Sequence, residues 1–152
     1  FNGVVRVLNL LFSIIKPNFA FFGEKDYQQL LIVKAMAQKH FKNIKIIGCP
    51  TKRDKRGLAM SSRNLLLKET DHNKAIQLIK LLEEAKIMFQ SSRHDSIEDY
   101  CLSKLKEFSV PEYFEIREVN SLEKVKDKIA KQRVFVAATI GKIRLIDNIE
   151  LN

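Results

Sequence analysis

FAFFGEKDYQQL, residues 19–30, is the stretch that decides the fold. It begins with a short apolar run, residues 19–22, of the kind that forms a buried strand of a parallel sheet. A polar turn containing Gly23 follows, and a helix is expected from about Asp26 to His40. A β-branched run over residues 44–48 predicts a second strand, so strand, helix and strand form one βαβ unit.

An apolar helix is expected ahead of this unit, over residues 4–16. Its polar residues recur at spacings of three and four and form a single stripe. They are Arg6, Asn9, Ser13 and Lys16. We therefore expect this helix to be nearly buried. One βαβ unit cannot cover both faces of a parallel sheet, and the chain opens on Phe1 rather than on Met, so we also expect the domain to have further strands upstream.

A different pattern follows the polar loop over residues 49–64. Two helices are expected, at 70–90 and 96–108. Three strands are expected after them, at 113–119, 133–140 and 142–151, with a short helical turn at 121–130 between the first two strands. Ser96 and Asp99 resemble a capping box for the second helix, and Gly141 is a candidate hairpin residue between the last two strands. Helices followed by strands predict a small α+β domain with an antiparallel sheet. We place the boundary near residue 64, which gives domains over 1–64 and 65–152.

The composition is typical of a soluble globular protein, with 45% hydrophobic and 30% charged residues. No apolar run reaches the roughly 18 residues that span a bilayer. Residues 1–16 lack the basic segment and the cleavage site of a signal peptide. Cys49 and Cys101 are too few for a disulfide framework and fit the reducing cytosol. We therefore expect a cytoplasmic protein without a membrane partner.

The net charge of +9 has two interpretations. It would attract anions such as nucleic acid or a nucleoside triphosphate, or it reflects a lysine-rich, solvated surface. The basic residues are spread along the whole chain, in clusters such as KRDKR (52–56) and as lone lysines. A nucleic-acid face usually concentrates charge on one element, so the solvated surface is the favoured interpretation.

The first candidate for chemistry is the turn from Gly23 to Asp26. It lies between a predicted strand and a predicted helix, where open α/β sheets bind ligands and where the free amides of a helix start suit phosphates. Gly23 allows a close approach to the backbone, Lys25 supplies a charge for a phosphate, and Asp26 can accept hydrogen bonds from ribose hydroxyls. The alternative is an ordinary polar turn in which Asp26 caps the helix.

The second candidate is GLAMSSRN, residues 57–64. Ser61 and Ser62, followed by Arg63, can grip a triphosphate through hydroxyl and charge-assisted guanidinium hydrogen bonds. The alternative is the start of a helix or turn that a serine caps. Alone, this segment is a weak signal.

The two segments together are far more specific. Three motifs at these separations resemble the pantothenate synthetase (pantoate–β-alanine ligase) family: GEKDYQQL (23–30), PTKRD (50–54) and GLAMSSRN (57–64). The opening FNGV and the closing IGKIRLIDNIEL are similar to that family too. The resemblance runs from Phe1 to about Leu151, although residues 66–112 match only in pattern.

The resemblance implies the carboxy-terminal half of such a ligase. It would comprise the rest of a Rossmann-like nucleotidyltransferase domain, related to class I aminoacyl-tRNA synthetases, and a smaller domain that covers the site. The implied reaction has two steps. The pantoate carboxylate attacks the α-phosphorus of ATP, giving pantoyl adenylate and pyrophosphate, and the amine of β-alanine then displaces AMP. Mg²⁺ accompanies the ATP, and the family is commonly dimeric, so a homodimer is expected.

The family pattern also implies a role for each matched residue of the first segment. Gly23 and Asp26 would meet the ribose and Lys25 the phosphates, with Glu24 in the same nucleotide-binding stretch. Gln29 would bind pantoate. In such a reaction the protein positions the reactants and stabilises charge on phosphate, rather than supplying a covalent nucleophile.

The second segment would be the counterpart of the synthetase KMSKS loop, which holds the phosphates. Its matched residues are Met60, Ser61, Ser62 and Arg63, and the last three join Lys25 as the implied catalytic residues. Position 52 is usually an apolar residue whose backbone touches adenine. Here it is Lys52, so this wall of the adenine pocket departs from the family pattern.

The family's histidine motif, which resembles the HIGH signature, and its first pantoate-binding glutamine lie in the amino-terminal half. Neither is present in residues 1–152. His40, His72 and His94 are expected to be solvated or packed, and no protein metal site is expected from the cysteine and histidine spacing. We therefore expect this chain to be inactive alone.

Two other hypotheses remain open. A basic RNA-binding module would use Lys52, Arg53, Lys55 and Arg56, but that loop lacks the aromatic platform of single-strand binders, so no nucleic-acid partner is expected. A purely structural or dimer-forming domain is the weaker alternative, and the apolar helix 4–16 would suit its interface.

Overall fold

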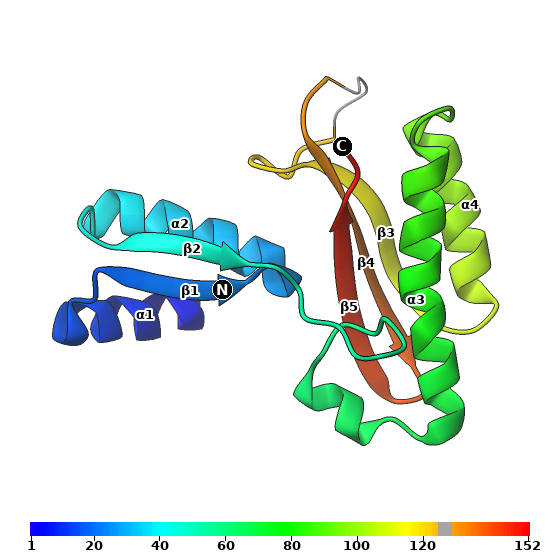
Figure 1. Ribbon diagram of the computed structural model, residues 1–152, viewed down its shortest axis with the longest axis horizontal. Coiled ribbons are helices and arrows are strands. Elements are labelled where there is room, and N and C mark those ends of the chain that lie inside the picture. The colour runs from blue at the N-terminus through cyan, green and yellow to red at the C-terminus, as the bar shows by residue number, and fades with distance from the viewer. Residues whose placement is uncertain (125–128) are drawn as a thin grey trace. The chain divides into compact units, whose positions relative to one another are not determined.

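The computed structural model describes residues 1–124 and 129–152, and the chain divides into two compact units (Figure 1). The first unit spans 1–51 and the second 52–152. This division falls earlier than the boundary near residue 64 that the sequence suggests. The reason is that the loop after Thr51 folds onto the second sheet, where Leu58 is buried in its core and Arg53 pairs with Asp147.

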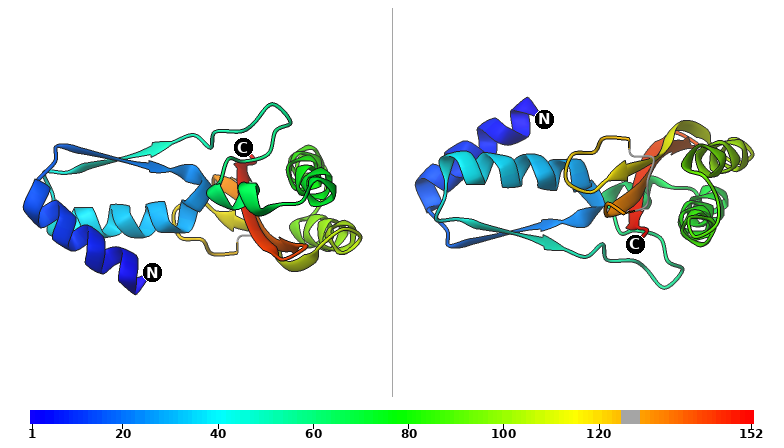
Figure 2. Two further views of the ribbon diagram at one scale, coloured as in Figure 1. Left: turned by 90° about the horizontal axis from the view of Figure 1, so that it is seen from below. Right: turned by 90° about the horizontal axis from the view of Figure 1, so that it is seen from above.

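The first unit contains the predicted βαβ arrangement. Its elements are α1 (Asn2–Ile15), β1 (Phe19–Gly23), the 3₁₀ helix η1 (Glu24–Asp26), α2 (Tyr27–His40) and β2 (Lys45–Cys49). The two strands pair in parallel, from Phe19 opposite Lys45 to Gly23 opposite Cys49. Both helices lie on one side of the strands (Figure 2) and enclose a small core of Phe12, Val33, Met36 and Ile44.

Helix α1 is far more exposed than its apolar sequence predicts. The pattern indicates a nearly buried helix, but Phe12 is its one buried residue, and Leu10 and Ile14 are 63% and 69% exposed. The apolar surface runs most of the way around the helix, whereas the described residues cover only the side that packs on α2 and the sheet. Lys16 caps the end of the helix: its φ of 49° is left-handed and its amide donates to the Phe12 carbonyl.

The second unit is an antiparallel sheet covered by two helices. Its elements are η2 (Ser62–Leu66), α3 (Glu69–Met88), α4 (His94–Lys106), β3 (Val110–Glu118), β4 (Gln132–Ile140) and β5 (Ile143–Glu150). The strand order is β3-β4-β5, so β4 is central. Gly141, with φ of 62°, makes the predicted tight turn between β4 and β5. The core includes Leu78, Leu82, Ile97 and Phe114, which places both helices on the same face (Figure 1).

The predicted α/β fold, with one parallel unit and one antiparallel sheet, is therefore confirmed. The capping box at Ser96 is wrong, because α4 begins at His94 and Arg93 occupies its cap position without a side-chain hydrogen bond. The Ile97 amide donates to the Arg93 carbonyl, which puts Ser96 inside the first turn. The helical turn predicted over 121–130 lies partly outside the described residues.

Candidate functional site

The first predicted segment follows β1 directly. Gly23 is the last residue of the strand, η1 makes one tight turn, and α2 begins at Tyr27. Gly23 has an ordinary φ of −68°, and a side-chain carbon added to it would have no described atom within 4 Å. The described part of the protein therefore does not require glycine here. An open space in front of the backbone suits the close approach of a ligand.

Asp26 does not take the capping role that the sequence left open. It occupies the cap position of α2 and is exposed, but its carboxylate makes no capping hydrogen bond. The capping alternative is therefore not realised at Asp26. Lys25, the residue before it, is half-buried.

Glu24 turns towards the neighbouring strand. A side-chain carbon added at Gly48, on β2, would lie 3.1 Å from Glu24 Oε1 and 3.0 Å from Leu30 Cδ2. Gly48 is thus the residue that allows Glu24 and α2 to approach β2 closely. Sequence reasoning did not single out this position, although a glycine inside a predicted strand is a recognised signal of close approach.

Gln29 lies in a shallow apolar hollow of about 410 Å³. The other lining residues are Gly3, Val4, Val7, Leu8 and Phe22. Gln29 thus places a side-chain amide against apolar walls contributed by α1 and β1. Such a site suits a small ligand that has an aliphatic body and a polar group.

The second predicted segment grows out of a small hairpin. Arg53 and Ala59 form an isolated antiparallel bridge, and the Met60 amide donates to the Lys52 carbonyl at 2.9 Å. The Asp54 carboxylate accepts from the Arg56 and Leu58 amides at 2.8 and 3.0 Å. Gly57 has φ of 89°, a value that favours glycine, and completes the turn.

The hairpin presents Met60, Ser61, Ser62 and Arg63 at its end. The Ser61 hydroxyl accepts from the Arg63 amide at 3.2 Å and caps η2, so the capping alternative holds for this serine. Ser62 and Arg63 are exposed, and so is Met60, at 53%. An exposed serine and an exposed arginine thus follow one another in a capped turn.

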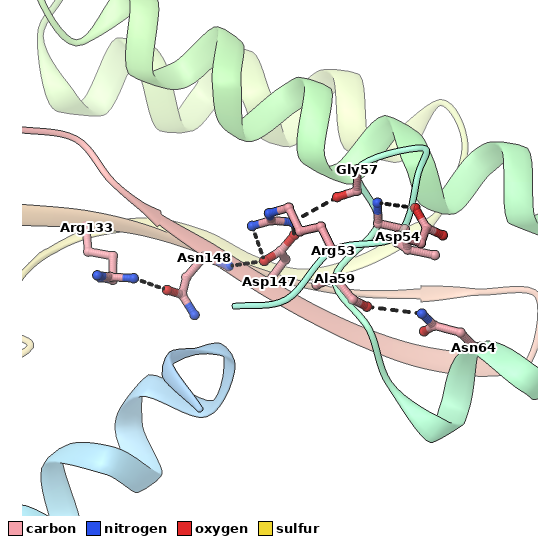
Figure 3. Close-up of polar contacts among 9 residues, drawn as sticks. Arg53, Asp54, Gly57, Ala59, Asn64, Arg133, Asp147 and Asn148 are labelled. Atoms are coloured by element: carbon pink, nitrogen blue, oxygen red, sulfur yellow. Dashed lines mark hydrogen bonds and ion pairs between the residues drawn. The ribbon is translucent and has the colours of Figure 1, made fainter. Parts of the chain in front are cut away.

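Arg53 is bound inside its own unit rather than displayed on the surface. Its guanidinium donates to both oxygens of Asp147 on β5, at 2.6 and 3.0 Å (Figure 3). This removes one of the four basic residues of the RNA-binding hypothesis. Lys52, Lys55 and Arg56 remain exposed. The sequence offers Arg53 as part of the PTKRD motif and as a possible nucleic-acid contact, and does not connect it with Asp147.

The three histidines lie outside both segments. His40 is exposed at the end of α2, and the His94 ring packs 5.5 Å from the Phe89 ring. No group of three or more histidine, cysteine, aspartate or glutamate side chains is placed to hold a metal ion within residues 1–124 and 129–152. Over the same residues, no helix has the length and apolar character needed to cross a bilayer.

The site residues thus fall into two groups, each held by its own unit. The first unit carries Gly23, Glu24, Lys25, Asp26 and Gln29, and the second carries Lys52 and Met60 to Arg63. The fold is that of an α/β protein whose loops display the predicted ligand-binding residues. The family model described as pantoate–β-alanine ligase matches residues 1–150, and the chain therefore belongs to that family.

Individual relatives agree with the family. The chain is 38% identical over 150 residues to the pantothenate synthetase of Vesicomyosocius okutanii, covering 98% of this chain and 53% of that protein. It is 40% identical over 155 residues to the enzyme of Flavobacterium psychrophilum, covering 99% of this chain and 55% of that one. The chain thus spans about half the length of the relatives it matches.

Solved structures give the same result. Pantothenate synthetase from Thermus thermophilus superposes with a TM-score of 0.92 at 34% identity, over 99% of this chain and 56% of that one. A pantoate–β-alanine ligase from Francisella tularensis, complexed with β,γ-ATP and β-alanine, gives 0.63 at 32% identity, over 98% and 49%. The family resemblance found in the sequence is confirmed.

Proposed function

We propose that this chain forms part of an enzyme that condenses pantoate with β-alanine at the expense of ATP. Pantoyl adenylate is the intermediate, and AMP and pyrophosphate are released. The observation that carries the proposal is the family match over residues 1–150, which includes both loop segments. The Francisella relative, solved with an ATP compound and β-alanine, supports the same substrate class.

In the first unit, the strand-to-helix turn would bind the nucleotide and the hollow would bind the acid. The exposed Asp26 carboxylate accepts bonds from ribose hydroxyls, and the backbone at Gly23 lets the sugar approach. Lys25 pairs its charge with the phosphates in the Rossmann-like site. Glu24 packs the turn against Gly48 of β2. Gln29 binds pantoate, and the apolar walls of its hollow suit the two methyl groups of that substrate.

In the second unit, the capped turn would hold the triphosphate. Ser62 and Arg63 are exposed and adjacent, so they can donate to phosphate oxygens, and the Ser61 hydroxyl can donate while it accepts the Arg63 amide. The backbone of Met60 and Lys52 lines the nucleotide. The Lys52 carbonyl already accepts the Met60 amide and keeps a second lone pair for adenine.

Mg²⁺ would enter the site on the phosphates of ATP rather than in a protein cage. The described residues bring together no cluster of metal-ligating side chains, and Mg²⁺ is often held mainly by phosphates and water. We further propose a cytoplasmic homodimer without a nucleic-acid partner. The engagement of Arg53 by Asp147 supports the last point, because it weakens the basic patch that RNA would use.

The test is AMP release that depends on both pantoate and β-alanine. The full encoded chain should release AMP only when both substrates and Mg-ATP are present. Residues 1–152 alone should show no turnover above background, because the histidine motif that the family uses to stabilise phosphoryl charge is not among them. Robust turnover by residues 1–152 would contradict the second expectation. A full chain that releases no AMP would refute the proposed function.

A further inference from the structure

The loop that carries residues 60–63 is fastened to the sheet of its own unit at a buried point. Arg53 donates to Asp147 from Nη1 at 2.6 Å and from Nη2 at 3.0 Å (Figure 3). Nη1 also donates to the Gly57 carbonyl at 3.1 Å. Asp147 lies on β5 and is only 3% exposed. A bidentate arginine–carboxylate pair fixes the orientation of the two side chains as well as their distance. The Arg53 guanidinium therefore anchors the hairpin turn to β5.

Hydrogen bonds connect this anchored hairpin to the residues on either side of Ser61, Ser62 and Arg63. The Met60 amide donates to the Lys52 carbonyl at 2.9 Å, on one side of Arg53. On the other side of the motif, Asn64 Nδ2 donates to the carbonyl of Ala59, the bridge partner of Arg53, at 3.0 Å. The residues that flank 61–63 are therefore both bonded to the hairpin that Asp147 holds.

We propose that Arg53 and Asp147 are positioning residues for the recognition of nucleotide phosphates by Ser62 and Arg63, an inference that rests on the proposed function. The Arg53 guanidinium is engaged by Asp147 and Gly57, so its role is to orient the loop rather than to touch the ligand. A loop that is already fixed loses less conformational freedom when it binds. Small displacements of positioned groups are also costly in an adenylate-forming step.

A second ion pair on the same strand provides a matched control. Arg144, on β5, donates from Nε to both oxygens of Glu112 at 2.9 Å and joins β5 to β3 rather than to the loop. Breaking it with Arg144→Gln removes an arginine–carboxylate contact from the sheet without touching the hairpin.

The decisive variant is Asp147→Asn in the full encoded chain. Asparagine removes the charge but keeps an oxygen for the Asn148 amide, which donates to Asp147 Oδ1 at 2.8 Å. We expect the KM for ATP to rise about tenfold and the KM for β-alanine to change by less than about twofold. Arg144→Gln should leave both constants at wild-type values. A folded Asp147→Asn with an unchanged KM for ATP would overturn the proposal.

Two further measurements keep the test decisive. If Asp147→Asn fails to fold, Arg53→Met/Asp147→Asn replaces it, because removing both charges avoids leaving one buried and unpaired. Its KM for ATP should rise in the same way, and a wild-type value counts against the proposal.

If the wild-type protein releases no AMP with pantoate and β-alanine, the proposed function fails. Hydrogen exchange of the backbone amides of residues 57–63 then tests by itself whether the Arg53–Asp147 pair holds the loop in place. These amides should exchange faster in Asp147→Asn than in Arg144→Gln, and equal rates would overturn the positioning role.

Discussion

Glu98 Oε1 accepts the backbone amide of Ile116 at 2.7 Å, which joins α4 to the outer edge of β3. Among the strands of residues 1–124 and 129–152, β3 pairs only with β4, so this outward amide has no strand partner there. Glu98 is 9% exposed and its other oxygen lies 3.5 Å from Lys124 Nζ. The carboxylate therefore satisfies a buried strand amide at the junction of helix and sheet.

Glu98→Leu should destabilise the second unit, because it leaves the Ile116 amide buried and unsatisfied. We expect the free energy of unfolding to fall by about 1–3 kcal/mol, measured by urea denaturation. Glu98→Gln retains an accepting oxygen and should cost less. Lys124→Ala is the control, and should change the stability little because that side chain is 65% exposed. Equal stabilities of the leucine and glutamine variants would show that the hydrogen bond contributes nothing.

Lys25→Ala should slow adenylate formation in the full encoded chain much more than it weakens the use of β-alanine. Lys25 lies at the strand-to-helix turn close to Gly23, and in the proposed function its charge would meet phosphate charge that grows in the transition state. Removing such a group typically lowers the rate by about 10²-fold or more, with kcat and kcat/KM falling together. Pantoate-dependent exchange of pyrophosphate into ATP measures this step. An exchange rate equal to that of wild type would remove Lys25 from the proposed site.

Ser62→Ala and Ser61→Ala should separate ligand binding from capping. Ser62 is exposed, so its loss should weaken ATP binding by roughly 1–3 kcal/mol without changing the melting temperature. Ser61 caps η2, so its loss should also cost about 0.5–2 kcal/mol of stability. Titration calorimetry with Mg-ATP and thermal melting distinguish the two effects.

The same titration with a mixed RNA pool tests the competing hypothesis for this loop. If the loop binds RNA, replacing Lys52, Lys55 and Arg56 together should flatten the salt dependence of binding while Ser62→Ala keeps normal ATP affinity. We expect the opposite, with ATP affinity reduced in Ser62→Ala and no salt-sensitive RNA binding in any variant.

The Cys101 thiol should resist modification in the native protein, whereas Cys49 should react. Burial, aided by the nearby Glu84 carboxylate, raises the pKa of Cys101 to about 12. The reactive thiolate is therefore scarce at pH 8, and Cys101 is fully enclosed while Cys49 is half-exposed. Iodoacetamide labelling followed by peptide mass mapping should find one modified cysteine in the folded chain and both in urea. Rapid native labelling of Cys101 would contradict the placement of α4.

The sequence predicts most elements because each is a local pattern. The run at 19–22 and the hairpin at Gly141 depend on neighbouring residues, and both are found. Ser96 is a good capping residue, so the sequence predicts that α4 begins there. The helix instead begins at His94, and the amide of the buried Ile97 donates to the Arg93 carbonyl. The exposure of α1 escapes prediction for a related reason, since periodicity indicates which side chains can be buried but not what covers them.

The candidate site shows the same limit. Capping is an open alternative in the sequence for both Asp26 and a serine of the second segment, and the structure realises it only at Ser61. Nothing local separates these cases, because each depends on backbone angles set by the surrounding fold. The Arg53–Asp147 pair joins residues 94 positions apart, and the charge pattern of a sequence does not reveal such partners.

β2 approaches the turn after β1 so closely that Gly48 depends on residues of the GEKD motif (23–26), although Gly48 lies outside that motif in the sequence. Any side chain at position 48 would press on Glu24 and Leu30 within about 3 Å of its first carbon. If the proposed function holds, then in a library that randomises positions 24, 30 and 48 and is selected for growth without pantothenate, large side chains at 48 would be rarer than glycine. Survivors at 48 would carry compensating changes at 24 or 30, and such linked genotypes would map the turn genetically.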